Sequence, residues 1–288
     1  MKLANIFKYF SSGISASERS LIRLGCPYEK KPDGTLVAKG DINLRHKHLK
    51  RLPDLSDVIL EGSFLCGANQ LKSLKGAPRI VTGDFYCEYN QLKSLEHAPQ
   101  SVGGSYFCCN NQLTDLKGAP RSISGKFACN ENNLITLEGA PDVVGDGFIC
   151  HDNQLTSLVH APQDVKGGFW CHNNKLETLQ GAPNDVGGLF NCGKNKLLHY
   201  LHAPQGFTIF YSDLGDFHTY QSLKDKVLDT PAHIEAVQKW KESLYEKSTS
   251  LSQGFNIRKP LQLIFGRPAP AVEAIQVRKP LNFKTPSR

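Results

Sequence analysis

The sequence predicts a repeat solenoid in which short strands stack into a parallel β-sheet on the concave face. Three observations support this fold: a unit of 21 residues recurs seven times without insertion or deletion, an aromatic-x-Cys sequence opens each unit, and an Ala-Pro pair follows in its second half. A unit this short cannot bury a hydrophobic face by itself, so neighbouring units must stack. The cysteines mark the grid at Cys66, Cys87, Cys108, Cys129, Cys150, Cys171 and Cys192.

The unit reads F-x-C-x-x-N-x-L-x-x-L-x-(G/H)-A-P-x-x-V-x-x-x. The aromatic residue and the cysteine share one face of a strand, and we expect this face to point into the core with the leucines, the alanine and the valine. Each asparagine should hydrogen-bond backbone groups of the turn beneath it, because a buried amide must be satisfied. The return segment is too short for a full helix, and its prolines favour an extended, polyproline-like or short 3-10 backbone.

This pattern resembles the leucine-rich repeat, and most closely its short bacterial and phage subtype, which occurs in secreted bacterial effectors. F-x-C-x-x-N-x-L stands where the family core has L-x-L-x-x-N-x-L, and the Ala-Pro pair matches the proline-bearing back segment of the subtype. With a degenerate opening unit at 42–62, the resemblance covers residues 42–210. Some related effectors carry a cysteine-dependent ubiquitin-ligase domain after their repeats, but Cys192 is the last cysteine of this chain, so that activity is not expected.

Residues 1–41 are predicted to form an N-terminal helical cap, because the ends of a solenoid expose core and need a polar-faced lid. The segment SASERS at 15–20 is typical of a helix start. The first apolar stripe of this region either belongs to the cap or lies on a membrane surface. The two stripes are Ile6, Phe7 and Phe10, and then Leu21, Ile22 and Leu24.

Residues 211–252 are predicted to form a C-terminal helical cap. Thr230 and Pro231 make a favourable helix start, since Thr caps the first turn and Pro suits the first helical position. Apolar residues recur at helical spacing beyond this start, and their face is expected to cover the last repeat. These residues are Ile234, Val237 and Leu244, around Trp240.

Residues 253–288 form a basic, proline-containing tail. They carry seven Lys or Arg residues and one acidic residue, so the tail contributes +6 to the chain's net charge of +7. Such a segment is typical of an extended or disordered chain. It is either a solvated tail or a docking segment for an acidic partner or nucleic acid, with nucleic acid the less favoured alternative. Its candidate contact residues lie in a short motif, R-K-P-L, that occurs twice in the tail. They are Arg258, Lys259, Arg278 and Lys279.

The seven cysteines of the grid are expected to be buried, reduced thiols, because free Cys behaves as a small hydrophobe. Cys26 and Cys109 complete the nine cysteines, without a CxxC pair or a zinc-finger spacing, so no metal site or cofactor is expected. Reduced thiols favour a reducing compartment, either the cytoplasm or a host cytosol after delivery. The sequence lacks an apolar run of about 18 residues, and no membrane span is predicted.

Trp170 stands between Phe169 and Cys171, so its side chain should point away from the core on the concave face. The slot it occupies is large and apolar in five of the seven units, and the slot after the cysteine varies in residue type. Strand propensity alone would favour some of these residues, but a contiguous row of them is typical of an interaction site. The predicted contacts are Leu65, Tyr86, Phe107, Ile149 and Trp170 in the first slot, and Glu88, Cys109, His151 and His172 in the second.

These features predict a non-catalytic protein–protein interaction module that binds a partner on its concave face, such as a secreted effector, an adaptor or an enzyme inhibitor. The alternative is a nucleic-acid or acidic-surface binder that acts through the tail. A third reading starts from His151 and His172, which are expected close to Cys109, Asp152 and Glu88 and could hold a metal or act as acid and base. Open sheet surfaces rarely exclude water and no activated nucleophile is evident, so we expect no enzyme activity.

Overall fold

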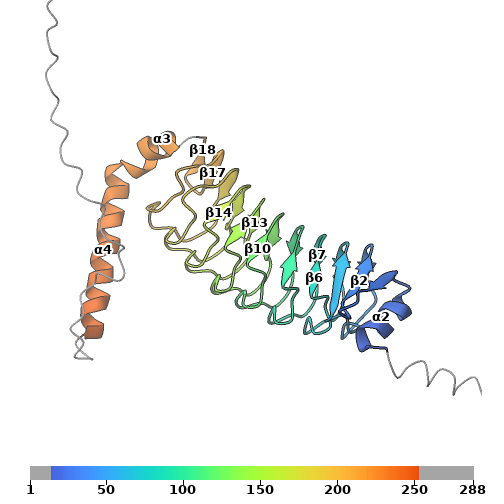
Figure 1. The fold of residues 1–288 in the computed structure, drawn as a ribbon. Coiled ribbons are helices and arrows are strands. Elements are labelled where there is room, and N and C mark those ends of the chain that lie inside the picture. Colours follow the sequence, from blue (N-terminus) through green and yellow to red (C-terminus); the bar gives the residue numbers. More distant parts are fainter. Residues whose placement is uncertain (1–13, 219, 253–288) are drawn as a thin grey trace, which may run out of the picture. The chain divides into compact units, whose positions relative to one another are not determined.

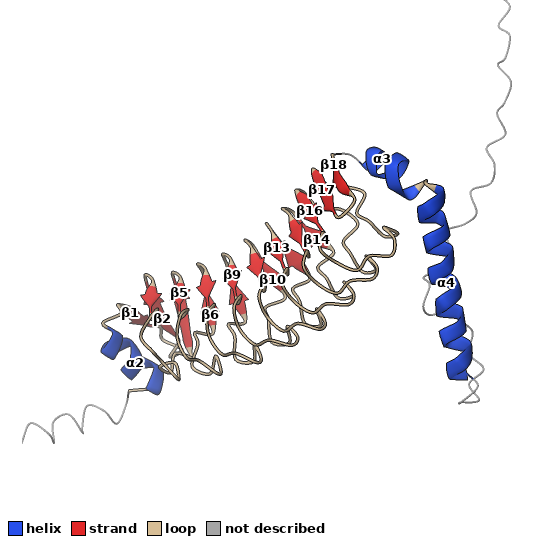
Figure 2. Cartoon of the chain, turned by 180° about the vertical axis from the view of Figure 1, so that it is seen from behind, coloured by secondary structure: helices blue, strands red, loops and turns tan. Residues whose placement is uncertain are grey.

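The computed structural model describes residues 14–218 and 220–252. The chain divides into two compact units, Met1–Trp240 and Lys241–Arg288. The first unit holds a solenoid of stacked turns together with its caps. Figures 1 and 2 show the strands of successive turns lined up along one side of this solenoid, and the loops along the other.

The seven aromatic-x-Cys segments lie in one ten-stranded sheet, which is parallel except at its C-terminal pair, β17 and β18. Equivalent positions of neighbouring turns pair with one another, as Phe127 does with Phe148. The predicted parallel sheet is therefore confirmed, and it begins in the degenerate opening unit. Its strands are β3 (Ile42–Asn43), β5 (Phe64–Leu65), β7 (Phe85–Tyr86), β9 (Tyr106–Phe107), β11 (Phe127–Ala128), β13 (Phe148–Ile149), β15 (Phe169–Trp170), β16 (Leu189–Asn191), β17 (Ile209–Ser212) and β18 (Gly215–Phe217).

A second sheet of eight strands, which the sequence analysis did not predict, runs through the back segments. The backbone there is extended, as expected, and the valine slot lies on it. The back segments of neighbouring turns are extended and stacked at the spacing of a β-sheet. Their backbones can therefore hydrogen-bond to one another, and the β-branched residue in each segment favours the strand conformation. The strands are β1 (Tyr28–Lys30), β2 (Leu36–Lys39), β4 (Val58–Glu61), β6 (Ile80–Val81), β8 (Ser101–Val102), β10 (Ser122–Ile123), β12 (Val143–Val144) and β14 (Asp164–Val165).

The core is a linear stack of aromatic rings flanked by the cysteines and leucines. Successive rings from Phe64 to Phe210 are stacked with centroids 5.0 to 5.8 Å apart, and all of them are fully buried. The seven cysteines of the grid are also fully buried. The predicted inward orientation of both slots is confirmed.

The asparagines form the predicted ladder. Asn132 donates from Nδ2 to the carbonyls of Cys129 and Asn130 in its own turn and of Cys108 in the turn before. Its Oδ1 accepts the N–H of Leu113 at 3.0 Å. The same four partners, at the same sequence offsets, recur from Asn90 to Asn195. Each amide therefore satisfies backbone groups of two successive turns that the stacking would otherwise bury unpaired.

The N-terminal cap is a helix followed by a β-hairpin, and so it is only partly helical. Helix α2 (Ala16–Leu24) starts at Ser15, whose Oγ accepts the N–H of Glu18. Strands β1 and β2 pair antiparallel, and β2 continues the second sheet by pairing with β4. Leu21 is buried in the core, but Ile22 is 52% exposed, so the predicted second stripe does not act as one face. The first stripe lies outside the described residues.

The C-terminal cap begins with strands, since β17 and β18 extend the solenoid beyond the predicted boundary at residue 210. Helix α3 (Tyr220–Leu223), a π-helical turn (Lys224–Leu228) and helix α4 (Pro231–Ser252) follow. Helix α4 reaches the last turn through His233, whose Nε2 accepts the N–H of Tyr200 at 2.9 Å, and through Trp240, whose ring meets that of His199 edge-on. Ile234 is 58% exposed, so the apolar face predicted for this helix is wrong at that residue. Within the described residues no helix is long and apolar enough to cross a membrane.

Candidate functional site

The outer face of the ten-stranded sheet carries two parallel rows of side chains. One row comes from the slot between the aromatic residue and the cysteine, and we call it the aromatic row. The other comes from the slot after the cysteine, and we call it the polar row. The aromatic row is Leu65, Tyr86, Phe107, Ala128, Ile149, Trp170 and Asn191. The polar row is Arg45, Gly67, Glu88, Cys109, Asn130, His151, His172 and Gly193.

The aromatic row is half-buried along most of its length, because its side chains lean on one another. The rings of Tyr86 and Phe107 stack with centroids 4.7 Å apart and planes 5° from parallel. The Tyr86 hydroxyl donates to Asp84 Oδ2 at 3.1 Å, and the guanidinium of Arg45 lies 4.9 Å above the Tyr86 ring. Burial and the neighbouring Asp84 raise the pKa of Tyr86, which keeps this phenol neutral. The row thus presents rings held in place by polar neighbours.

The indole of Trp170 lies back over two glycines that precede the aromatic positions of β13 and β15. A Cβ atom at Gly168 would come within 2.5 Å of Trp170 Cη2, and one at Gly147 within 2.6 Å of Cζ3. In the preceding turns the same slot holds side chains, such as Ser105 and Lys126. The contact between the indole and these two glycines was not predicted from the sequence. The available signal was that glycine replaces larger residues at this slot in the turn of Trp170 and in the turn before it.

Arg45 and Glu88 form an ion pair across the polar row, over the bare backbone of Gly67. Glu88 is 7% exposed, and burial raises the pKa of its carboxyl, although Arg45 opposes this effect. Arg45 was not among the predicted site residues. It belongs to the degenerate unit, where β3 aligns with β5 at an offset of 22 rather than 21 residues, as in the pairing of Ile42 with Phe64.

Cys109 is half-buried, in contrast to the fully buried cysteines of the grid. Burial raises the pKa of its thiol, and it raises the pKa of Cys108 further. A reactive cysteine needs the opposite shift, because the thiolate is the nucleophile. The geometry therefore gives no activated cysteine among the described residues of this face.

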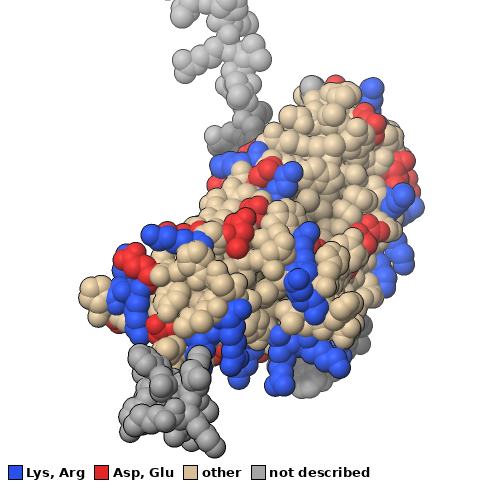
Figure 3. Space-filling model, turned by 90° about the vertical axis from the view of Figure 1, so that its right-hand side faces the viewer, with Lys and Arg blue, Asp and Glu red and all other residues tan. Residues whose placement is uncertain are grey.

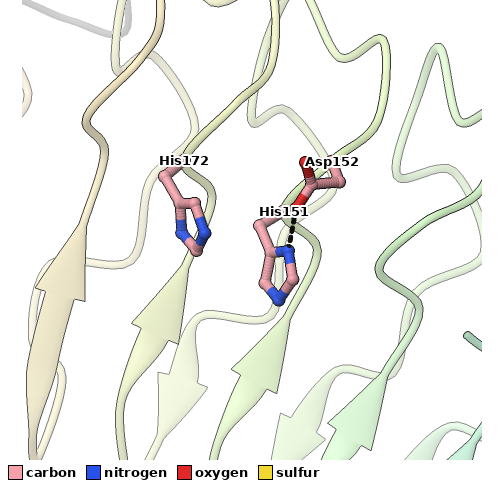
Figure 4. A group of neighbouring side chains, drawn as sticks. All are labelled: His151, Asp152 and His172. Atoms are coloured by element: carbon pink, nitrogen blue, oxygen red, sulfur yellow. Dashed lines mark hydrogen bonds and ion pairs between the residues drawn. The ribbon is translucent and has the colours of Figure 1, made fainter.

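His151 and His172 are neighbours on the polar row, and Asp152 lies beside them (Figure 4). The two imidazoles stack with centroids 4.4 Å apart, and His151 Nδ1 lies 2.5 Å from Asp152 Oδ2. Burial and the neighbouring His151 lower the pKa of His172, which favours a neutral imidazole. Burial tends to raise the pKa of Asp152, but hydrogen bonds from His151 and Asn173 lower it.

The structure brings predicted residues together in two groups. Arg45 links the stacked rings of Tyr86 and Phe107 to Glu88, and the two histidines stack beside Asp152. The expected proximity of the histidines to Cys109 and Glu88 is wrong, since Asn130 lies between Cys109 and His151 in the register of the sheet. The tail residues Arg258, Lys259, Arg278 and Lys279 lie outside the described residues.

A hollow on the loop side of the N-terminal turns was also missed by sequence reasoning. Its lining combines apolar residues such as Leu52, Ala77 and Pro78 with five cationic side chains and the carboxylate of Asp54. Figure 3, which faces this end of the solenoid, shows Lys and Arg side chains gathered along the lower edge. The signal in the sequence was the run of basic residues between the leucines of the first units. The cationic residues are Lys50, Arg51, Lys72, Lys75 and Arg79.

No family model and no curated protein matches this chain. Among solved structures, the chain is similar to YopM from Yersinia enterocolitica, a leucine-rich-repeat protein, with a TM-score of 0.51 and 20% sequence identity. The similarity covers 72% of this chain and 43% of YopM, so the chain spans less than half of the length of that protein. At this identity the likeness concerns the fold. Together with the stacked turns of 21 residues, it shows that this chain folds as a leucine-rich-repeat solenoid.

Proposed function

We propose that the chain is a non-catalytic protein-interaction module that binds a protein partner across the aromatic and polar rows. The observation that carries this proposal is the contrast between the slots of one repeat. The inward slots repeat their residue types, whereas the outward slots hold rings, charges and imidazoles that differ from turn to turn. A rigid stack that presents varied, partly exposed aromatic and charged groups fits the way hot-spot residues are arranged in interfaces.

The thiol chemistry supports a binding role in a reducing compartment. Burial raises the pKa of the cysteines of the grid and of Cys109, which is the opposite of what a nucleophilic cysteine requires. Buried thiols on adjacent turns persist where disulfides do not form. The setting that fits is therefore the cytoplasm or, for an effector of the kind this fold supports, the cytosol of a host cell.

The proposal is tested by capturing partners with matched variants from lysates of the source cell and of a host. Tyr86→Ala and Trp170→Ala remove rings from the aromatic row, and Ile135→Ala removes a 60%-exposed side chain outside both rows. We expect a partner retained by wild type and Ile135→Ala to be lost from both ring variants. A partner bound equally well by all four proteins would contradict binding through the rows.

A second candidate function is the binding of an acidic protein segment, and the hollow on the loop side favours it. The lining of the hollow holds five cationic side chains, one carboxylate and several apolar residues, which suits a peptide that combines carboxylates with apolar residues. The test is the salt-dependent binding of a poly-glutamate peptide by wild type, by Lys72→Glu combined with Lys75→Glu, and by a chain shortened to residues 1–252. Loss in the charge-reversed variant alone places the binding in the hollow, and loss in the shortened chain alone places it in the basic tail. Binding of duplex RNA in preference to the peptide would contradict the choice of partner.

A further inference from the structure

We propose that His151, His172 and Asp152 bind a divalent transition-metal ion such as Zn²⁺ on the outer face of the ten-stranded sheet. No metal site was expected from the sequence, because it has no CxxC pair and no zinc-finger spacing, although the two histidines were recognised as residues that could hold a metal. In the fold, one ligand atom from each residue lies within 4.8 Å of the others. Among the described residues, these three form the one group of at least three His, Cys, Asp or Glu side chains whose ligand atoms lie this close together.

The repeat builds the group in two ways. Parallel pairing of β13 with β15 sets the polar-row positions of neighbouring turns side by side, which places the two imidazoles face to face. The position after the polar row has a left-handed backbone in every turn, with φ of 54° at Asp152. This conformation turns the chain sharply at the end of the strand and brings the Asp152 carboxylate back to His151.

The ligand types fit such an ion. Two imidazoles and one carboxylate form a frequent protein ligand set for Zn²⁺, and imidazole also suits Ni²⁺ and Cu²⁺. The carboxylate of Asp152 and the two imidazoles each offer one ligand atom, and these three atoms lie close together. His172 Nδ1 is buried without a hydrogen-bond partner among the described residues, so one donor atom is free to bind.

The surroundings of the group resemble those of a supported metal site. The Asn173 amide donates to Asp152, as a second-layer residue does when it orients a metal-binding carboxylate. The side chains of His151 and Asp152 are 22% and 38% exposed, so an ion can enter from solvent. The stacked rings must rotate for their nitrogens to converge on one ion, because Zn–N bonds are about 2.0–2.1 Å long. Three protein ligands leave a fourth position for water or for a group from a partner.

His233, in helix α4, makes a useful contrast with His172. His233 uses both ring nitrogens, since Nε2 accepts the Tyr200 N–H and Nδ1 donates to the Leu228 carbonyl. Both ring nitrogens of His233 are therefore occupied, whereas Nδ1 of His172 has no hydrogen-bond partner among the described residues.

The test is calorimetric titration of the full chain, without a histidine tag, with Zn²⁺ at pH 7.5. Absorption spectra with Co²⁺ report the ligands that surround the ion. We expect one strong site in wild type, at least about tenfold weaker binding in His151→Gln and in His172→Gln, and a similar loss in Asn173→Ala. His160→Gln is the matched control, because His160 lies in the turn before Ala-Pro and should leave the affinity unchanged.

Thermal melts without metal establish that each variant is folded. The proposal is overturned if wild type binds no more tightly than the variant that combines His151→Gln with His172→Gln. It is also overturned if His160→Gln weakens binding as much as His172→Gln. Neither outcome bears on partner capture by the aromatic row, so this inference stands or falls independently of the proposed function.

Discussion

The Trp170 indole rests on Gly168 so closely that a Cβ atom there would lie 2.5 Å from the ring. The indole of this tryptophan can lie along the sheet surface because no side chain occupies the space beneath it. Its orientation depends on two residues that contribute no contact atoms beyond the backbone, Gly147 and Gly168.

Gly168→Ala should displace the indole toward solvent. The backbone at 168 is compatible with alanine, since its φ is not positive, so the effect is a clash with the ring. In a Trp240→Phe background, the emission of Trp170 should shift to longer wavelength. Gly193→Ala is the control, because its Cβ would meet its nearest neighbour at an ordinary 3.6 Å. Unchanged emission in Gly168→Ala would show that the indole does not rest on this platform.

Phe169→Ala and Trp170→Ala should separate stability from binding. Phe169 is fully buried in the aromatic stack, so its removal should cost about 3–5 kcal/mol of unfolding free energy. Trp170 is half-buried on the outer face, and its removal should lower stability by much less while weakening partner binding at least about tenfold. Chemical denaturation and affinity measurements on both variants check this. The reverse pattern would mean that Trp170, and not Phe169, points into the core.

Asn132→Ala should destabilise the protein by about 1–3 kcal/mol, because it leaves backbone groups of two turns buried and unpaired. Asn195 makes the same bonds but is more exposed, near the end of the stack, so Asn195→Ala should cost less. The measurement is denaturant unfolding of both variants. Equal and negligible losses would argue against a stabilising role for the ladder.

Thiol labelling of the native protein should modify two cysteines before the other seven. Cys26 and Cys109 are half-buried, whereas the cysteines of the grid are fully buried. Burial also raises the pKa of the buried thiols, which lowers the fraction of reactive thiolate. Mass spectrometry after short exposure to a maleimide checks the order, with Cys109→Ser to identify its peptide. Uniform labelling of all nine would contradict the inward assignment.

Glu88→Gln should reveal the balance between burial and the ion pair with Arg45. Burial raises the pKa of Glu88 in the folded state, so its stabilising contribution is present below the unfolded pKa of about 4.3 and is lost as the pH rises through the folded value. The stability of wild type relative to Glu88→Gln should therefore fall as the pH rises above the unfolded pKa of about 4.3. A relative stability that rises with pH would mean that Arg45 outweighs burial.

The sequence predicted the features that follow from a strict period. Phe127, Cys129 and Asn132 repeat because each occupies a position that the stack fixes, and their burial and hydrogen bonds are as expected. The second sheet was not predicted, because strands of two residues are too short to show an alternating pattern.

The features that depend on local exceptions escaped sequence reasoning. Arg45 was not recognised because the opening unit is offset by one residue from the repeat. The role of the two glycines under Trp170 becomes apparent only once the position of the indole is known. The neighbourhood of His151, His172 and Asp152 was predicted, since equal slots on adjacent turns must meet and Asp152 directly follows His151. The left-handed backbone at Asp152 was not predicted.

The asparagine ladder has a consequence for how such a chain changes its length over evolution. Every rung from Asn90 to Asn195 joins the same atoms at the same offsets, so a gene duplication that inserts one whole turn of 21 residues creates a new rung and breaks none. An insertion that is not a whole number of turns changes these offsets, as in the opening unit, where Asn69 accepts the N–H of Leu49 at an offset of 20. Whole-turn steps therefore lengthen the recognition surface without remaking any rung, while the side chains on that surface diversify between duplications.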